Sequence, residues 1–141
     1  MIRAVLFDLD GGLVETRRVH YDALNLALRD AGCARIEERQ HEDLYNGLPT
    51  VRKLELLVER GLVPPERVNA VIFSKKKYTT TLLSKTVTFD PNIYCVCAGL
   101  RAYGKRIGVV SNAIRDTVTS VCTKLRLVAF VETYVGNEDG P

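Results

Sequence analysis

The sequence predicts an α/β fold, in which a short parallel sheet carries a helical segment inserted after its first strand. Three observations support this prediction. An apolar run at residues 2–7 ends in two aspartates and two glycines, which is typical of a strand covered on both faces whose carboxyl end bears functional groups. Residues 17–84 show helical periodicity with no strand between the helices, and from residue 90 onward helices alternate with strands.

The composition is ordinary for a globular protein. Apolar residues make up 46% and charged residues 26% of the 141 residues, which excludes disordered and collagen-like chains and leaves room for one ordinary domain or two small layers. The net charge of +3 is small, and the basic residues are scattered apart from Lys75–Lys77, so we expect no nucleic-acid partner. Because no leader peptide precedes the first strand and no apolar run could span a bilayer, we expect a cytoplasmic protein without a membrane partner.

The first predicted strand leads into two carboxylates, Asp8 and Asp10. On an extended chain, residues two apart project to the same side, and Gly11-Gly12 allows a sharp turn whose amides face an anion. A calcium loop is excluded, because Gly12 and Leu13 stand where that loop needs an oxygen ligand and a glycine. A simple Asp-Gly turn is the alternative, but it would not explain two acids directly after a buried strand.

The middle of the chain predicts a helical bundle. We expect helices at residues 17–31, 41–46, 50–60 and 65–84, separated by glycines and by a turn at 46–49. The same periodicity would suit any helical domain, so its assignment depends on its position between the flanking strands. The residues predicted to face inward are Ala23, Leu24, Ala27, Leu28, Val51, Leu54, Leu57, Val58, Val68, Val71, Ile72 and Leu82.

The last third of the chain predicts the rest of the sheet. A helix follows Asp90-Pro91, a strand covers 106–110, a second helix follows Ser111-Asn112, and a third strand covers 127–135. This order implies a right-handed parallel connection. Ser111 either caps the second helix or, with the N-terminal amides of that helix, contacts an anion. The predicted inward residues are Ile93, Val96, Cys97, Leu100, Ile114, Val118, Val121, Cys122 and Leu125, so Cys97 and Cys122 are expected to be reduced core thiols.

The two strand ends resemble motifs I and II of the haloacid dehalogenase (HAD) superfamily of phosphatases and phosphotransferases. Motif I is an apolar strand followed by D-x-D-G-T-L, and residues 8–13 match it with Gly12 in place of the threonine, which we expect to loosen the turn. Motif II is a strand ending in Ser or Thr, often followed by Asn, as in Ser111-Asn112. The resemblance implies a Rossmann-like core with an incomplete parallel sheet, formed by residues 1–15 and 86–141, and a helical C1 cap formed by residues 16–85.

The resemblance also implies a reaction, which is Mg²⁺-dependent phosphoryl transfer from a small phosphorylated metabolite. Asp8 would be the nucleophile and a Mg²⁺ ligand. Asp10 would be the general acid and base, and its backbone carbonyl would also touch the metal. Ser111 would hold the phosphoryl group, with Gly11, Gly12 and Asn112 contacting the substrate. Hydrolysis and intramolecular transfer both remain open.

Three residues of the predicted cap extend the resemblance toward the β-phosphoglucomutase and phosphoglycolate phosphatase branch. His20 lies just after motif I, Arg52 follows the turn at 46–49, and Lys76 is a looser match to a cap lysine. Each would contact the substrate. The alternative for His20 is an exposed residue near a helix start, and for Arg52 and Lys76 it is a solvated surface charge.

Motifs III and IV of the family would follow the third strand, and the sequence reaches Pro141 without them. We expect either a fragment of a longer phosphatase or a natural truncation. Asp8 and the Asp10 carbonyl alone would hold Mg²⁺ weakly. The first strand would become an exposed apolar edge, which favours self-association. A second hypothesis is therefore a catalytically impaired HAD-like domain that acts as a binding or assembly module.

Overall fold

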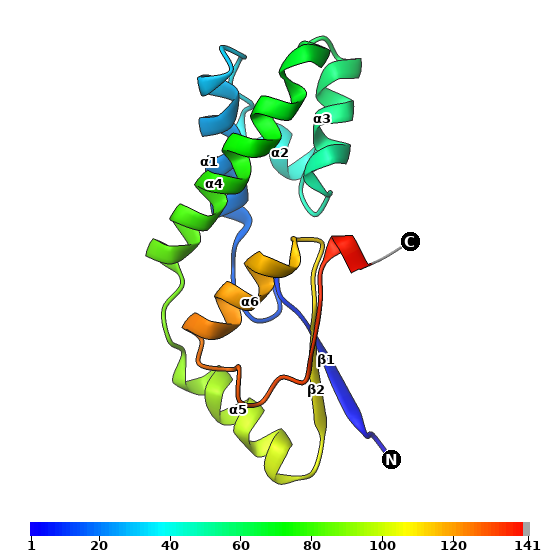
Figure 1. The fold of residues 1–141 in the computed structure, drawn as a ribbon, viewed down its shortest axis with the longest axis vertical. Coiled ribbons are helices and arrows are strands. Elements are labelled where there is room, and N and C mark those ends of the chain that lie inside the picture. Colours follow the sequence, from blue (N-terminus) through cyan, green and yellow to red (C-terminus); the bar gives the residue numbers. More distant parts are fainter. Residues whose placement is uncertain (140–141) are drawn as a thin grey trace. The chain divides into compact units, whose positions relative to one another are not determined.

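The computed structural model describes residues 1–139 and divides into two compact units (Figure 1). The sheet unit contains Met1–Glu15 and the chain from Lys85 onward, and the helical unit is Thr16–Ser84. The predicted α/β class with a parallel sheet is confirmed. Within the described residues, every helix is too short or too polar to cross a membrane.

The sheet has three parallel strands in the order β1-β2-β3, where β1 is Ala4–Asp8, β2 is Arg106–Val110 and β3 is Thr133–Val135. Asp8 pairs with Val110, and Val110 pairs with Val135. All three strands therefore end at the same edge of the sheet. The loops that leave this edge are those that carry Asp10 and Ser111, so the pairing brings the two predicted motifs together.

Two helices lie on the same side of the strands (Figure 1). Helix α5 (Pro91–Ala102) packs against β2, and helix α6 (Arg115–Lys124) packs against β3. The Asp90 carboxylate caps α5 by accepting a hydrogen bond from the Asn92 amide at 2.8 Å. The predicted inner face of α5 is wrong at Val96, which is exposed, whereas Cys97 is buried as expected. Burial also raises the pKa of the Cys122 thiol on α6 to about 12.

The prediction that the first strand is buried on both faces is wrong. Val5 and Phe7 are half-buried, but Leu6 between them is 70% exposed. In the described part of the chain, β1 pairs with β2 alone, and α5 and α6 cover one side of the sheet. Alternate residues of a strand point to opposite faces, so an apolar run of this kind is buried throughout only where both faces are covered.

The third strand is shorter than predicted. The expected strand began at Leu127, but the Leu127 carbonyl accepts hydrogen bonds from the amides of Phe130 and Val131 and closes a turn. The chain becomes extended only at Thr133, after the Glu132 amide donates to the Ile107 carbonyl at 2.9 Å. The apolar residues at 127–131 therefore form a turn instead of extending the strand.

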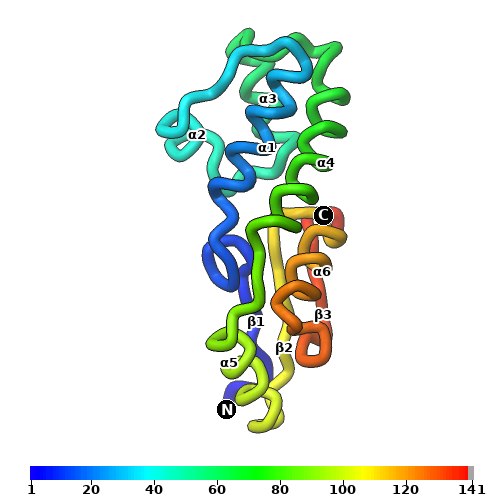
Figure 2. The backbone as a smooth tube through the Cα atoms, turned by 90° about the vertical axis from the view of Figure 1, so that its left-hand side faces the viewer, coloured from blue at the N-terminus to red at the C-terminus, as the bar shows by residue number. Residues whose placement is uncertain are grey.

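The helical unit consists of α1 (Arg17–Asp30), α2 (Glu38–Leu44), α3 (Thr50–Glu59), a 3₁₀ turn at Pro65–Arg67 and α4 (Val68–Thr86), of which the last two residues belong to the sheet unit. Figure 2 shows its helices gathered together. Helix α2 begins three residues earlier than predicted. The predicted inward stripe of α3 is wrong at Val51, which is 55% exposed, and Lys53 is buried instead. The core is formed by Leu24, Ala27, Leu28, Ile36, Tyr45, Leu54, Leu57, Val63 and Val71.

Candidate active site

The loop that follows β1 is held tightly against the sheet. The Leu9 amide donates to the Val110 carbonyl at 3.1 Å, and the Leu13 amide donates back to the Asp8 carbonyl at 3.1 Å. Leu9 and Leu13 are both buried and anchor the loop. We expected Asp8 and Asp10 to lie on one extended segment and to project to the same side. The strand β1 ends at Asp8, so Asp10 lies in the loop beyond it. Asp8 is exposed at the strand end, and Asp10 is half-buried in the loop.

Both glycines of this loop are required by its geometry. Gly11 has a φ of +85°, which other residues adopt only with strain. A Cβ atom on Gly12 would lie 2.2 Å from the Asp8 carbonyl oxygen. The expectation that Gly12 loosens the turn is therefore wrong. The glycine allows the backbone to approach Asp8 more closely than a threonine could.

Ser111 joins the ends of β1 and β2. It is 6% exposed, its Oγ donates to Asp10 Oδ2 at 3.0 Å, and the same Oγ accepts from the Ala113 amide at 3.0 Å. Helix α6 starts at Arg115 with Ile114 as its N-cap residue. The expectation that Ser111-Asn112 caps this helix is thus wrong, and Asn112 is an exposed residue of the connecting loop.

An acidic turn after β3 meets the start of α6. The Glu138 carboxylate accepts from the Arg115 amide at 2.8 Å, and the Asp139 carboxylate pairs with the Arg115 guanidinium and accepts from the Gly136 amide at 2.8 Å. The Gly136 amide, and secondarily Arg115, lower the pKa of Asp139. At least one of the helix amides predicted to contact an anion therefore already has a carboxylate partner.

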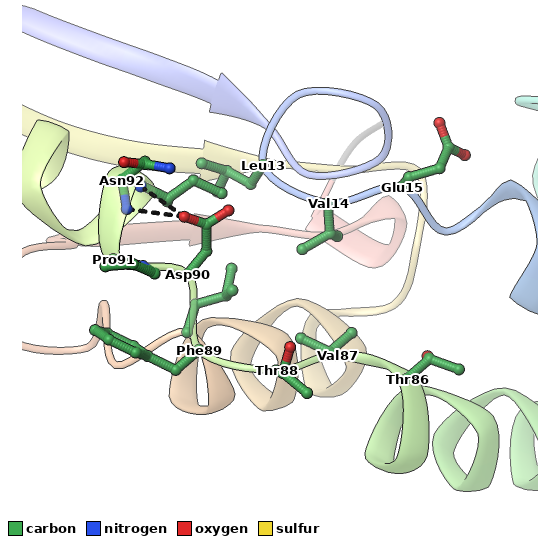
Figure 3. Close-up of a pocket in the computed structure, with 12 residues that line it drawn as sticks. Leu13, Val14, Glu15, Thr86, Val87, Thr88, Phe89, Asp90, Pro91 and Asn92 are labelled. Atoms are coloured by element: carbon green, nitrogen blue, oxygen red, sulfur yellow. Dashed lines mark hydrogen bonds between the residues drawn. The ribbon is translucent and has the colours of Figure 1, made fainter.

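A separate open cavity of about 510 Å³ lies in the sheet unit (Figure 3). It is lined by Leu13–Glu15 from the loop after motif I, by residues 86–93 and by Leu125. Its polar groups include Glu15, Asp90 and Thr88, and Asp90 is the helix cap described above. Asp8, Asp10 and Ser111 do not line it, so the cavity is distinct from the candidate site.

The three residues predicted in the cap all belong to the helical unit. His20 is half-buried in α1, and Lys76 is exposed on α4. Arg52 of α3 pairs with Glu55 at 2.8 Å, and both side chains are about half exposed. The structure thus brings Asp10 and Ser111 together within the sheet unit, and it gives Arg52 a partner on its own helix.

The helical unit also contains a buried polar cluster that was not predicted from the sequence, formed by His41, Lys53 and Lys75. Their exposed fractions lie between 2% and 6%. Lys53 Nζ lies 3.5 Å from His41 Nε2. Burial, followed by the charges of Lys53, His20 and Lys75, lowers the pKa of His41 to about 4. The Thr79 hydroxyl is buried and has no hydrogen-bond partner in the described part of the chain.

A sequence signal for this cluster exists in the helical spacing. Lys75 lies four residues from Val71 and from Thr79, and all three are buried on one face of α4. Lys53 lies next to Leu54 and four residues before Leu57 on α3. Lysine is rarely buried, so burial of Lys53 and Lys75 is not expected from residue type, and the family resemblance pointed instead to the neighbouring positions Arg52 and Lys76.

The residues present supply a partial set of magnesium ligands. Asp8 and Asp10 offer the hard oxygen donors that Mg²⁺ prefers. Within residues 1–139, however, no three His, Cys, Asp or Glu side chains lie close enough together to form a metal site by themselves. Asp8 and Asp10 thus fit Mg²⁺ by donor chemistry but do not complete an octahedron.

The family model of the haloacid dehalogenase-like hydrolases matches residues 5–140 of the chain. The chain belongs to this family. A comparison with curated proteins found no match. The predicted membership of the HAD superfamily is therefore confirmed by a match that covers almost the whole chain.

Solved structures of the same fold include three HAD proteins of bacterial origin. A predicted phosphoglycolate phosphatase from Haemophilus somnus has a TM-score of 0.83 and 19% identity over 99% of this chain. CbbY from Rhodobacter sphaeroides, in complex with phosphate, has a TM-score of 0.82 and 20% identity over 98%. β-Phosphoglucomutase from Clostridium difficile has a TM-score of 0.81 and 22% identity over 99%. The chain spans 64% of the length of each of these proteins.

Proposed function

We propose that this chain carries the nucleophile and acid–base part of a HAD phosphoryl-transfer site, in a phosphatase or phosphomutase that acts on a small phosphorylated metabolite. The hydrogen bond from Ser111 to Asp10, at the edge where β1 and β2 end beside Asp8, is the observation that carries the proposal. It joins the two motifs, which are about a hundred residues apart in the sequence, in one hydrogen-bonded group.

Asp8 is the proposed nucleophile. Its carboxylate oxygen forms a bond to phosphorus while the bond from phosphorus to the ester oxygen breaks, which leaves an aspartyl phosphate. Asp10 donates a proton to the departing oxygen and later takes one from the attacking water or hydroxyl. The exposure of Asp8 allows a substrate to reach it, and the Ser111 hydroxyl orients the Asp10 carboxylate.

Mg²⁺ would be held by the Asp8 carboxylate and the Asp10 backbone carbonyl. When bound, it would neutralise charge that develops on the phosphoryl oxygens. The Ser111 hydroxyl has one proton, so it would turn from Asp10 to a phosphoryl oxygen once substrate is bound. Gly11, Gly12 and Asn112 would contact the substrate beside it. Gly12 supports this role, because it lets the loop backbone approach the nucleophile without a side chain between them.

The helical unit is the proposed cap, corresponding to the predicted residues 16–85. His20, Arg52 and Lys76 remain proposed substrate contacts of this unit. Lys53 and Lys75 join them, because both are buried basic side chains near His41. CbbY, which has a similar fold, was solved with phosphate and with xylulose-(1,5)bisphosphate, which supports a small phosphorylated substrate here. A cytoplasmic location and self-association through β1 complete the proposal.

The test is Mg²⁺-dependent hydrolysis of p-nitrophenyl phosphate by the purified chain. We expect Asp8→Asn to abolish turnover. The matched control is Asp43→Asn, which removes an exposed carboxylate of the helical unit that pairs only loosely with Arg39, at 3.8 Å. Equal turnover in Asp8→Asn and the wild type would refute the role of Asp8. Binding of a phosphate ester by calorimetry without turnover in the folded wild type would favour the binding-module hypothesis.

A further inference from the structure

The acidic turn after β3 is connected by a continuous set of hydrogen bonds to Ser111 and Asp10, which we call the candidate catalytic pair. The Ser111 amide donates to the Val135 carbonyl at 3.0 Å, and the Asn137 amide donates to the Ala113 carbonyl at 3.0 Å. Residues 111–113 therefore lie beside residues 135–137 with bonds in both directions. The position of the Ser111 loop depends on where this turn lies.

Two carboxylates fix the turn to the start of α6. Asp139 contacts both segments, because its carboxylate accepts a hydrogen bond from the Gly136 amide and pairs with the Arg115 guanidinium through two nitrogen atoms. Glu138 accepts from the Arg115 amide at 2.8 Å. Charge-assisted bonds of this bidentate kind fix geometry better than neutral ones.

The backbone at Gly136 lies very close to the residues that start α6. A Cβ atom on Gly136 would lie 2.5 Å from the Arg115 amide nitrogen and 3.0 Å from the Ala113 carbonyl oxygen. Such contacts are too close for any side chain, so the backbone at Gly136 must lie directly against the first residues of α6. Arg115, Gly136 and Ala113 thus form one packed unit.

The backbone of Ala113 connects this turn to Ser111 and Asp10. Its carbonyl accepts from Asn137, and its own amide donates to Ser111 Oγ, which donates in turn to Asp10 Oδ2. The Ser111 hydroxyl is almost fully buried, so its direction is set by these two partners.

We propose that Glu138 and Asp139 are positioning residues for the candidate catalytic pair: by fastening the turn after β3 to Arg115, they hold the Ala113 amide on Ser111 and thereby direct the Ser111 hydroxyl toward Asp10. This inference rests on the proposed function, because it assigns the two acids a task in the same site. They act through Ser111 and touch no substrate.

The experiment measures amide hydrogen exchange in the full chain. In Glu138→Gln/Asp139→Asn, we expect the Ala113 and Asn137 amides to exchange about tenfold faster, because the variant side chains keep an acceptor oxygen but lose the charge that strengthens their hydrogen bonds. The matched control is Glu132→Gln, which removes a carboxylate paired with Arg101 and Arg106 in the same unit, away from residues 111–113. Wild-type exchange at Ala113 in the double variant would overturn the proposal.

A second variant separates positioning from general loss of structure. In Ser111→Ala, the Ala113 amide has lost its acceptor, so adding Glu138→Gln/Asp139→Asn should not speed its exchange further, and fully additive effects would overturn the proposal. If the double variant does not fold, Arg115→Lys, which keeps the charge but not the two-nitrogen contact, should speed exchange at the same two amides, and unchanged exchange would be equally decisive.

Turnover gives an independent readout. With an active wild type, we expect Glu138→Gln/Asp139→Asn to lower kcat while KM stays within about twofold, because the acids do not touch substrate. A changed KM with an unchanged kcat would contradict the positioning role. An inactive wild type would count against the proposed function alone, because the exchange measurements do not depend on turnover.

Discussion

The stability of the helical unit should fall as the pH is lowered through the range in which free histidine titrates. His41 is buried among Lys53, Lys75 and the rings of Tyr21 and Tyr45. Its pKa is lowered from 6.5 to about 4, chiefly by burial and then by the charges of Lys53, His20 and Lys75. Between these two values the unfolded chain binds a proton on His41 and the folded chain does not.

The sign and size of the effect follow from this difference in proton binding. Where the unfolded state binds more protons, the free energy of unfolding rises with pH. The contribution of His41 is therefore complete above about pH 6.5 and is lost as the pH falls toward about 4. One pKa unit corresponds to about 1.4 kcal/mol, so the full loss is about 3 kcal/mol.

The assay is urea unfolding of the wild type and of His41→Gln at several pH values between 7.5 and 4. Glutamine keeps an acceptor for Lys53 and does not titrate, so the difference in unfolding free energy between the two proteins isolates His41 from the carboxylates. The control is His20→Gln, which replaces the other histidine of the chain, a half-buried residue. A wild-type minus His41→Gln difference that stays constant over this range would refute the reasoning.

Two further predictions concern the sheet unit. Gly12→Ala should destabilise the protein by about 1–3 kcal/mol in thermal unfolding, because its Cβ would meet the Asp8 carbonyl oxygen. The control is Gly99→Ala on helix α5, where a Cβ meets no other atom within 4 Å, and it should be neutral or stabilising by up to about 1 kcal/mol. Equal effects of the two substitutions on stability would contradict the loop geometry. Leu6→Lys should shift light scattering toward the monomer if β1 pairs between copies, whereas Phe73→Lys, at an exposed position of the helical unit, should not; a wild type that is already monomeric would rule out self-association.

The features that the sequence predicted well are those that depend on neighbouring residues. β2 has the predicted bounds, because its apolar run is flanked by a helix end at Gly104 and a loop at Ser111. The juxtaposition of Asp10 and Ser111 follows from two parallel strands that end at one edge. These arguments need only local pattern and the rule that parallel strands align their carboxyl ends.

The features that failed depend on what covers a residue. The burial of Leu6 is decided by the layer over its face of the sheet, and an apolar run cannot reveal whether that layer is present. The turn at Leu127 uses apolar residues that would equally suit a strand. Arg52 and Lys53 are both basic residues near the start of one helix, and only packing against α2 distinguishes them. Ser111 matches the composition of a helix cap, but the backbone starts the helix four residues later.

The pairing of β1 with β2 has a consequence for synthesis of the protein. Ala4 pairs with Arg106, so β1 leaves the ribosome about a hundred residues before its partner strand. At roughly 5–20 residues per second, it waits about 5–20 s without that neighbour. The helical unit is continuous from Thr16 to Ser84 and is complete before β2 emerges. If it folds first, it shortens the flexible chain that must close for β1 to meet β2, which lowers the entropy cost of closure and reduces the time an apolar edge is available to other nascent chains.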